Sequence, residues 1–214
     1  MKTFVVLAAS AALLLLCPVA ARAVDDPMLS NCTGCNLANV DWHGRSLRGA
    51  HLAGTDFKHA NLQNADLRDA HLAGVDFEAT DLRGADLRGA NLAGCDLRGA
   101  RLKAARLDGA HIAGGNFDDA DLSAAHLTQA QLVGTDARRA NLANAVLDDA
   151  ALCYRDSDGR TDCTDLRGAN LRGASMHRVR LCTQGSNRTE RCDELVSPQM
   201  LRDLAHANLD GALL

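Results

Sequence analysis

The sequence predicts an all-β solenoid, a chain wound into stacked coils around a narrow core. Three observations predict it. An apolar residue, usually Leu, recurs every fifth residue over most of the chain, and a second pattern repeats every twenty residues. Ala and Leu, with 38 and 33 copies, supply a third of the 214 residues, while aromatic residues make up 3%. This composition argues against a core of mixed large side chains, and repetition at a fixed period is typical of stacked coils.

The bulk composition also limits the class of protein. Apolar residues make up 47% of the chain and charged residues 23%, which excludes a disordered polar chain and a polytopic membrane protein. The formal net charge of −4 is too small to indicate a nucleic-acid binder. We therefore expect no nucleic-acid partner.

Residues 1–23 have the pattern of a cleavable secretory signal. Lys2 precedes an apolar run over residues 4–17, and the small-residue site Ala21-Arg22-Ala23 follows. The run is shorter than the roughly 20 residues of a membrane-spanning helix, so we expect no stable membrane insertion after cleavage; an uncleaved anchor is the alternative. The expected location is periplasmic or secreted, where disulfide bonds persist.

Residues 24–36 are expected to form an N-terminal cap that contains Cys32-Thr-Gly-Cys35. Counted back from the repeat, Cys32 occupies an inward central position and Cys35 an inward small position. We expect a buried disulfide or thiol pair that closes the first coil. The alternative is a redox site, because Cys-x-x-Cys is also the spacing of thiol oxidoreductases.

The regular repeat covers residues 37–152. Of the 24 positions in one five-residue register, 18 are Leu. A small residue, nearly always Ala, lies two positions before each centre, and the residue between them is usually Asp, Asn or His. The six centres that are not Leu are Trp42, Phe57, Phe77, Ile112, Phe117 and Ala137.

A period of five fits neither ordinary element. Five steps along an α-helix would scatter the Leu residues around its axis, and in a straight strand they would alternate between the two faces. The pattern is satisfied if each pentapeptide is a short extended piece followed by a bend. Gly two residues after many centres, as at Gly54 and Gly74, suits that bend.

Segments such as Ala60-Asn61-Leu62 and Ala85-Asp86-Leu87 resemble the pentapeptide-repeat family, whose signature is Ala-(Asp/Asn)-Leu-x-x. The resemblance covers residues 37–152 continuously and returns in the coil at 166–181. It implies a right-handed quadrilateral parallel β-helix, here of about seven to eight coils.

Four sides of five residues require a period of twenty, and the sequence contains one. The three Phe centres lie multiples of twenty apart, on one side of the coil. The small positions of that side include no Ala. They are Cys35, Thr55, Val75, Cys95, Gly115 and Thr135. We expect Cys95, the odd cysteine, to be a buried small apolar residue.

Two loops, 153–165 and 182–194, interrupt the repeat, and each places the next centre fourteen residues on instead of five, which is an insertion of nine residues. Each is polar and bounded by cysteines, so we expect the disulfides Cys153–Cys163 and Cys182–Cys192. Closing such an eleven-residue loop would contribute about 3 kcal/mol in the chain-entropy model. A four-thiolate zinc site is the alternative, although the short Cys-x-x-Cys spacing of most zinc sites is missing.

Residues 195–214 are expected to cap the far end of the solenoid. Ser197 and Pro198 suit the start of a short helix. The segment 207–211 matches one last pentapeptide.

The sequence has no pattern typical of an enzyme, and we expect no catalytic residue and no cofactor. One side of the coil carries a column of imidazoles, His51, His71 and His111, interrupted by Asn91. Stacked imidazoles can share a metal ion, but a solvated polar ladder is the simpler interpretation.

On the same side, Ala53, Ala73, Ala93 and Ala113 form a smooth strip of small residues. Such a strip suits close contact with an unknown protein partner or with a second copy; the alternative is a side that merely tolerates small residues.

The best-known activity that the resemblance implies is mimicry of DNA by acidic rods that bind type II topoisomerases. Here Arg68 and Arg88 follow Asp66 and Asp86 by two residues, so the surface mixes signs. We therefore expect a non-enzymatic structural or protein-binding module of the cell envelope. A metal-binding or redox protein that uses the His column or the Cys32/Cys35 pair is the alternative.

Overall fold

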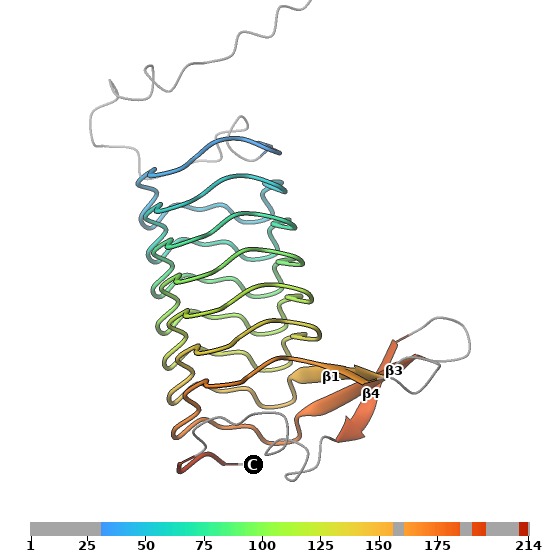
Figure 1. The fold of residues 1–214 in the computed structure, drawn as a ribbon. Coiled ribbons are helices and arrows are strands. Elements are labelled where there is room, and N and C mark those ends of the chain that lie inside the picture. Colours follow the sequence, from blue (N-terminus) through green and yellow to red (C-terminus); the bar gives the residue numbers. More distant parts are fainter. Residues whose placement is uncertain (1–30, 156–160, 185–189, 196–209, 214) are drawn as a thin grey trace, which may run out of the picture.

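A computed structural model describes residues 31–155, 161–184, 190–195 and 210–213. The chain winds into a straight rod of stacked coils, and a small sheet projects from the rod near its C-terminal end (Figure 1). None of the described segments forms a helix long and apolar enough to cross a membrane. The predicted signal at 1–23, most of the predicted cap at 24–36 and the helix expected after Ser197 lie outside the described residues.

Hydrogen bonds between successive coils hold the rod together. The N–H groups of Leu52 and Gly54 donate to the carbonyls of His71 and Ala73 in the next coil, at 2.9 Å each. Within the pentapeptide, the N–H of Thr55 donates to the carbonyl of Leu52 at 3.1 Å and closes the bend. Each side of a coil contributes one parallel bridge, so the structure is a β-helix although its individual strands are minimal.

The bend requires a left-handed residue two positions after each centre. Gly54 has φ of 67° there, and the same conformation occurs where the residue is His59 (φ 57°) or Ala79 (φ 56°). Left-handed backbone is open to Gly at little cost and strained for residues with a Cβ. This explains why Gly is frequent at this position, as the sequence indicated.

The frequent Asp or Asn before each centre has a backbone role. The N–H one residue after the centre takes no part in the coil-to-coil ladder. Asp56 Oδ1 accepts this N–H from Lys58 at 2.9 Å, and Asn116 Oδ1 accepts it from Asp118 at 2.9 Å. Because a short carboxylate or amide two residues back reaches this donor, the repeat favours Asp and Asn there.

The register confirms twenty residues per coil in the regular part. His51 bridges His71, and Asp76 bridges Asp96. Across the first insertion, Asp136 bridges Asp165, which is 29 residues away and thus one coil plus nine residues.

Two sides of the rod differ in the residues that they carry. The Phe face has its centres at 57, 77, 97, 117 and 137; the His face comprises the outward residues of 51–54, 71–74, 91–94, 111–114 and 131–134.

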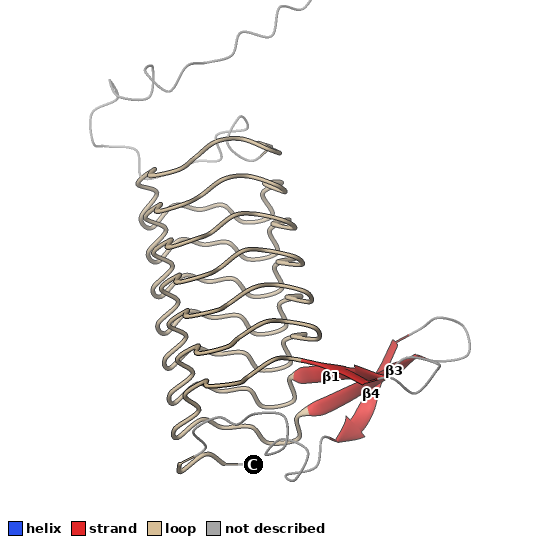
Figure 2. Cartoon of the chain, viewed as in Figure 1, coloured by secondary structure: helices blue, strands red, loops and turns tan. Residues whose placement is uncertain are grey.

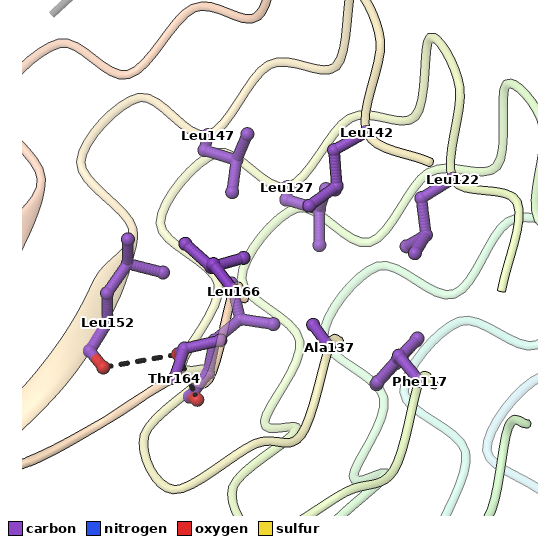
Figure 3. A pocket seen from close by; sticks show the side chains of 10 residues that line it. Phe117, Leu122, Leu127, Ala137, Leu142, Leu147, Leu152, Thr164 and Leu166 are labelled. Carbon is purple, nitrogen blue, oxygen red and sulfur yellow. Dashed lines mark hydrogen bonds between the residues drawn. The ribbon is translucent and has the colours of Figure 1, made fainter. Parts of the chain in front are cut away.

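The core consists of the central apolar side chains and the small residues two positions before them, which stack on their equivalents in the next coil. Phe57 and Phe77 are fully buried and stack with ring centroids 5.6 Å apart, and Trp42 meets Phe57 edge-on at 5.5 Å. The stack is incomplete at Ala137, which lies between Phe117 and Leu166. A cavity of about 10 Å³ remains there, lined by apolar side chains and Thr164 (Figure 3). It is too small and too apolar to serve as a ligand site.

The two Cys-bounded insertions combine into one sheet (Figure 2). Its strands are β1 (Ala151–Arg155), β2 (Thr161–Cys163), β3 (Arg180–Gln184) and β4 (Glu190–Leu195). Their order is β2-β1-β3-β4. Each insertion makes an antiparallel hairpin, and β1 pairs with β3 in parallel because both continue the same side of the rod in successive coils.

At the far end, the chain returns to the rod. Leu213 bridges Ser175, and the N–H of Gly173 donates to the carbonyl of Asp210 at 3.0 Å. Gly211 has φ of 68°, the left-handed bend of the repeat. The segment 210–213 therefore continues the coil-to-coil ladder.

Candidate functional site

Charges on most sides of the rod are paired within one pentapeptide. Arg88 donates from Nε and Nη2 to the two carboxylate oxygens of Asp86, at 2.8 and 2.6 Å. This hydrogen bonding lowers the pKa of Asp86 below its ordinary value. The same arrangement recurs in Asp66–Arg68, Asp81–Arg83, Asp96–Arg98, Asp136–Arg138 and Asp165–Arg167. The surface is thus not the uniformly acidic one that DNA mimicry requires.

Other pairs link neighbouring coils. Lys58 Nζ lies 3.1 Å from Asp76 and 3.3 Å from Glu78. Arg98 lies 3.4 Å from Glu78 and also pairs with Asp96. In the part of the chain that the structure describes, Asp76, Glu78 and Asp96 are the only group of three His, Cys, Asp or Glu residues whose possible ligand atoms all lie within 4.8 Å of one another. Because Lys58 and Arg98 already pair with these three carboxylates, we interpret the group as an ion-pair network.

The His face differs from the other sides because it carries no charged residue. Its outward positions from 51 to 134 hold His, Asn, Gln, Ala, Val and Gly. The Phe face, one corner away, presents charged residues in each of the same coils, from Asp56 and Lys58 to Asp136 and Arg138. A partner would therefore meet the His face without displacing ion pairs.

The structure brings two of the three imidazoles together. The rings of His51 and His71 stack with centroids 4.3 Å apart and planes 8° from parallel. His111 follows only after Asn91, since the bridges run from His71 to Asn91 and from Asn91 to His111. The lone pair of an imidazole nitrogen lies in its ring plane, so two parallel rings do not direct lone pairs at one ion. The observed stack suits a polar ladder better than a chelate.

The Ala strip lies beside this ladder. Ala53, Ala73, Ala93 and Ala113 are each partly exposed and occupy the same position in successive coils. Their carbonyls are used in the coil-to-coil ladder, as in the bond from Gly74 N–H to Ala93 at 2.9 Å. The strip therefore offers methyl groups on an even backbone surface.

The structure describes three sets of cysteines. Cys153 is joined to Cys163 across β1 and β2, and Cys32 to Cys35. Cys32 and Cys35 are only partly buried, whereas the sequence led us to expect a buried pair. They lie in the first described coil, where one side of the stack has no described coil to cover it. Cys182 and Cys192 lie on the paired strands β3 and β4, and their bond stays a prediction.

Cys95 is buried and donates through Sγ to the carbonyl of Leu72 at 3.0 Å. Burial raises the pKa of its thiol to about 12. The thiol is therefore protonated at neutral pH and unreactive, as expected of a small core residue.

Sequence reasoning missed one polar cluster. Asp148, Ser175 and His177 lie together on the side centred at Leu147 and Met176. Beside it, Asp149 is buried and pairs with Arg178 at 2.6 Å and Arg180 at 3.2 Å. Asp148 and Asp149 precede the residues that they contact by 27 to 31 positions. The sequence would align them only if the nine residues of the first insertion were subtracted from this spacing.

Comparison with known proteins agrees with the geometry. The family model for pentapeptide repeats matches in eight copies, which cover residues 30–153 and 160–183. The chain belongs to the pentapeptide-repeat family. Pentapeptide-repeat proteins form right-handed quadrilateral β-helices, and they are generally structural or protein-binding modules.

Several solved structures of pentapeptide-repeat proteins match this chain. HetL from the cyanobacterium Nostoc, involved in regulation of heterocyst differentiation, is 27% identical, with 86% of this chain and 84% of HetL covered and a TM-score of 0.28. Rfr23 from the cyanobacterium Cyanothece is 23% identical over 56% of this chain and 86% of its own, with a TM-score of 0.37. A pentapeptide-repeat protein of the Arabidopsis thaliana thylakoid lumen is 29% identical over 45% and 68%, with a TM-score of 0.32. Among curated protein sequences no match is found.

Proposed function

We propose that this pentapeptide-repeat protein is an exported, non-enzymatic binding module of the cell envelope, and that the His face is its contact surface. The uncharged His face carries this proposal. Burying a charged side chain at an interface costs free energy unless it is paired again. The His face avoids this cost along the four coils from 51 to 114, before Asp162 of β2 comes to lie beside Gly134, and its Ala strip allows close approach of a partner protein or a second copy.

Export is supported by the sequence and by the cysteines. Residues 1–23 match a secretory signal, and disulfides such as Cys153–Cys163 persist in oxidising compartments. Fractionation of expressing cells, with intact mass measurement of the purified protein, tests this point. A mature chain that begins at Val24 and carries disulfides supports export, and a full-length reduced chain in the cytoplasm contradicts it.

The contact surface is tested by paired charge insertions. Ala73→Glu with Ala93→Glu places two carboxylates on the His face. Ser123→Glu with Ala143→Glu places them at the same pentapeptide position on another side and is the matched control. We expect only the first pair to abolish self-association seen by light scattering, or capture of a partner from periplasmic extract. Equal behaviour of the two variants would contradict the assignment of the His face.

A second candidate function is thiol–disulfide exchange at Cys32–Cys35, because this disulfide is partly exposed at the end of the rod. Reduction would take two electrons from a dithiol partner, forming its disulfide and two thiols here. A Cys35→Ser variant tests the reverse step: its free Cys32 thiol should attack the disulfide of the oxidised partner and remain in a mixed disulfide, because Cys35 is missing as the resolving thiol. Failure to trap one in periplasmic extract, where a known exchange substrate is trapped, counts against this candidate.

A further inference from the structure

The cluster of Asp148, Ser175 and His177 has unusual internal geometry. Ser175 Oγ lies 2.6 Å from Asp148 Oδ1 and 2.9 Å from His177 Nδ1. Asp148 Oδ1 and His177 Nδ1 are 3.3 Å apart, so the three atoms form a closed triangle. Asp148 comes from one coil, and Ser175 and His177 from the next, on either side of the centre Met176.

The arrangement is not that of a hydrolytic triad. There, the serine bonds one ring nitrogen of the histidine and the carboxylate bonds the other, so the imidazole takes the serine proton while the carboxylate orients it. Here the hydroxyl and the carboxylate oxygen both face Nδ1 of His177. The ring cannot link them in series, and a nucleophilic role for Ser175 is disfavoured.

Instead, the triangle has the dimensions of one side of a metal coordination sphere. Ligand atoms about 2.1 Å from a zinc-like ion lie about 3.0 to 3.4 Å apart in octahedral or tetrahedral geometry. The observed separations of 2.6, 2.9 and 3.3 Å need shifts of only a few tenths of an ångström, about 0.4 Å at most, to match. We propose that Asp148 and His177, with Ser175 as a weaker third donor, bind a divalent transition-metal ion such as Zn²⁺.

The charges and hydrogen bonds around the site are compatible with a bound cation. The neighbouring Arg178 and Arg180 both pair with Asp149, so one of their two positive charges is offset. The backbone N–H of His177 donates to Asp148 Oδ1 at 3.0 Å and holds the carboxylate beside the ring. The His177 side chain is 53% exposed, which leaves room for water ligands.

The ion would act as a clamp between two coils. It would join the coil that carries Asp148 to the one that carries Ser175 and His177, next to the strands β1 and β3 that leave the rod. Binding only to the folded state raises thermal stability as the ion concentration rises above its dissociation constant. The site thus predicts metal-dependent stabilisation of the C-terminal coils.

The test is calorimetric titration of the disulfide-intact mature protein with Zn²⁺, together with its melting temperature with and without Zn²⁺. Asp148→Asn and His177→Gln should each weaken binding at least about tenfold and abolish the rise in melting temperature. Ser175→Ala should weaken binding less. His126→Gln, on the same side two coils away, is the matched control and should bind as the parent does.

Long-range ¹H–¹⁵N NMR of the imidazoles separates this site from the His face. Zn²⁺ should shift the Nδ1 resonance of His177 and leave those of His51 and His71 unchanged. Binding lost in His71→Gln but kept in His177→Gln would overturn the proposal, as would the absence of any saturable binding by millimolar Zn²⁺. Circular dichroism of each variant without metal shows whether a loss of binding reflects unfolding.

Discussion

The coils from 51 to 130 and those from 131 to 181 are built on one repeat but stabilised in different ways. In the first region, fully buried Phe57, Phe77 and Phe117 fill the Phe face. In the second, Ala137 leaves a cavity at the equivalent position. There the buried carboxylate of Asp149 pairs with Arg178 and with Arg180 of β3, and a disulfide joins Cys153 of β1 to Cys163 of β2.

The difference shows what the repeat supplies and what an insertion requires. A regular coil buries its core and satisfies its backbone simply by matching its neighbours. Where nine residues leave the rod and return, the flanking coil must be held by interactions that the repeat does not contain. Substitutions in the two regions should therefore differ in their effects on stability.

Phe77→Ala should have the largest effect. Truncating a fully buried Phe in the regular region should lower the free energy of unfolding by about 3 to 5 kcal/mol. Phe77→Leu, which reproduces the residue at Leu97 of the same column, should cost less than about 1.5 kcal/mol. Urea unfolding followed by circular dichroism measures both, and similar losses in the two variants would show that the Phe column is not tightly packed.

Removing the disulfide of the projecting sheet should come next. Cys153→Ser with Cys163→Ser frees an eleven-residue loop and should cost about 3 kcal/mol, against about 2 kcal/mol for Cys32→Ser with Cys35→Ser, which frees a four-residue loop. Hydrogen exchange should show lost protection in β1 to β4 but not in residues 51–130. Uniform loss along the rod would mean that the two regions unfold as one unit.

Ala137→Leu should make the second region resemble the first, because it fills the cavity in the core. The added methyl groups enter the cavity beside Phe117 and Leu166, and the free energy of unfolding should rise by about 1 kcal/mol. Ala120→Leu, which adds the same atoms where the core is full, should instead cost about 1 to 3 kcal/mol. A lower free energy of unfolding in Ala137→Leu would show that this coil does not accommodate Leu, the usual residue at central positions.

Acidification should lower the free energy of unfolding less than these substitutions do, and it should affect both regions. Hydrogen bonds from arginine lower the pKa values of Asp66, Asp86 and Asp165 in the folded state. A carboxyl whose pKa is lower in the folded state stabilises it above the unfolded value of about 3.9, and this contribution disappears as the pH falls through the lower folded value.

Urea midpoints should therefore stay level from pH 7 to about pH 5 and fall below about pH 4. Arg88→Gln should reduce the fall, because Asp86 loses the partner that lowers its pKa. A midpoint that falls equally in the variant and the parent would show that this pair contributes nothing measurable, as many exposed ion pairs do.

Much of the fold could be predicted from the sequence because the repeat is local and strict. A spacing of five marks each side and a spacing of twenty each coil, so the stacking of His51 on His71 and the burial of Cys95 follow from counting. The sequence could not show that Ala137 leaves a cavity, since that depends on how far Phe117 and Leu166 close over it. Nor could it show that the two insertions form one sheet, because this requires β1 and β3 to leave the same corner at bonding distance.

By itself, the sequence determined the solenoid, its four sides, the His column and the Ala strip, since each depends only on residues a fixed number of positions apart. Where the repeat is interrupted, only the tertiary structure decided which residues become neighbours. It placed Asp148 beside Ser175 and His177, paired Asp149 with Arg178 and Arg180, and joined two polar insertions into a sheet. The physical reason is register: within an unbroken repeat, hydrogen bonding fixes each residue's neighbours at twenty positions, but after an insertion the neighbours depend on the path by which the chain returns.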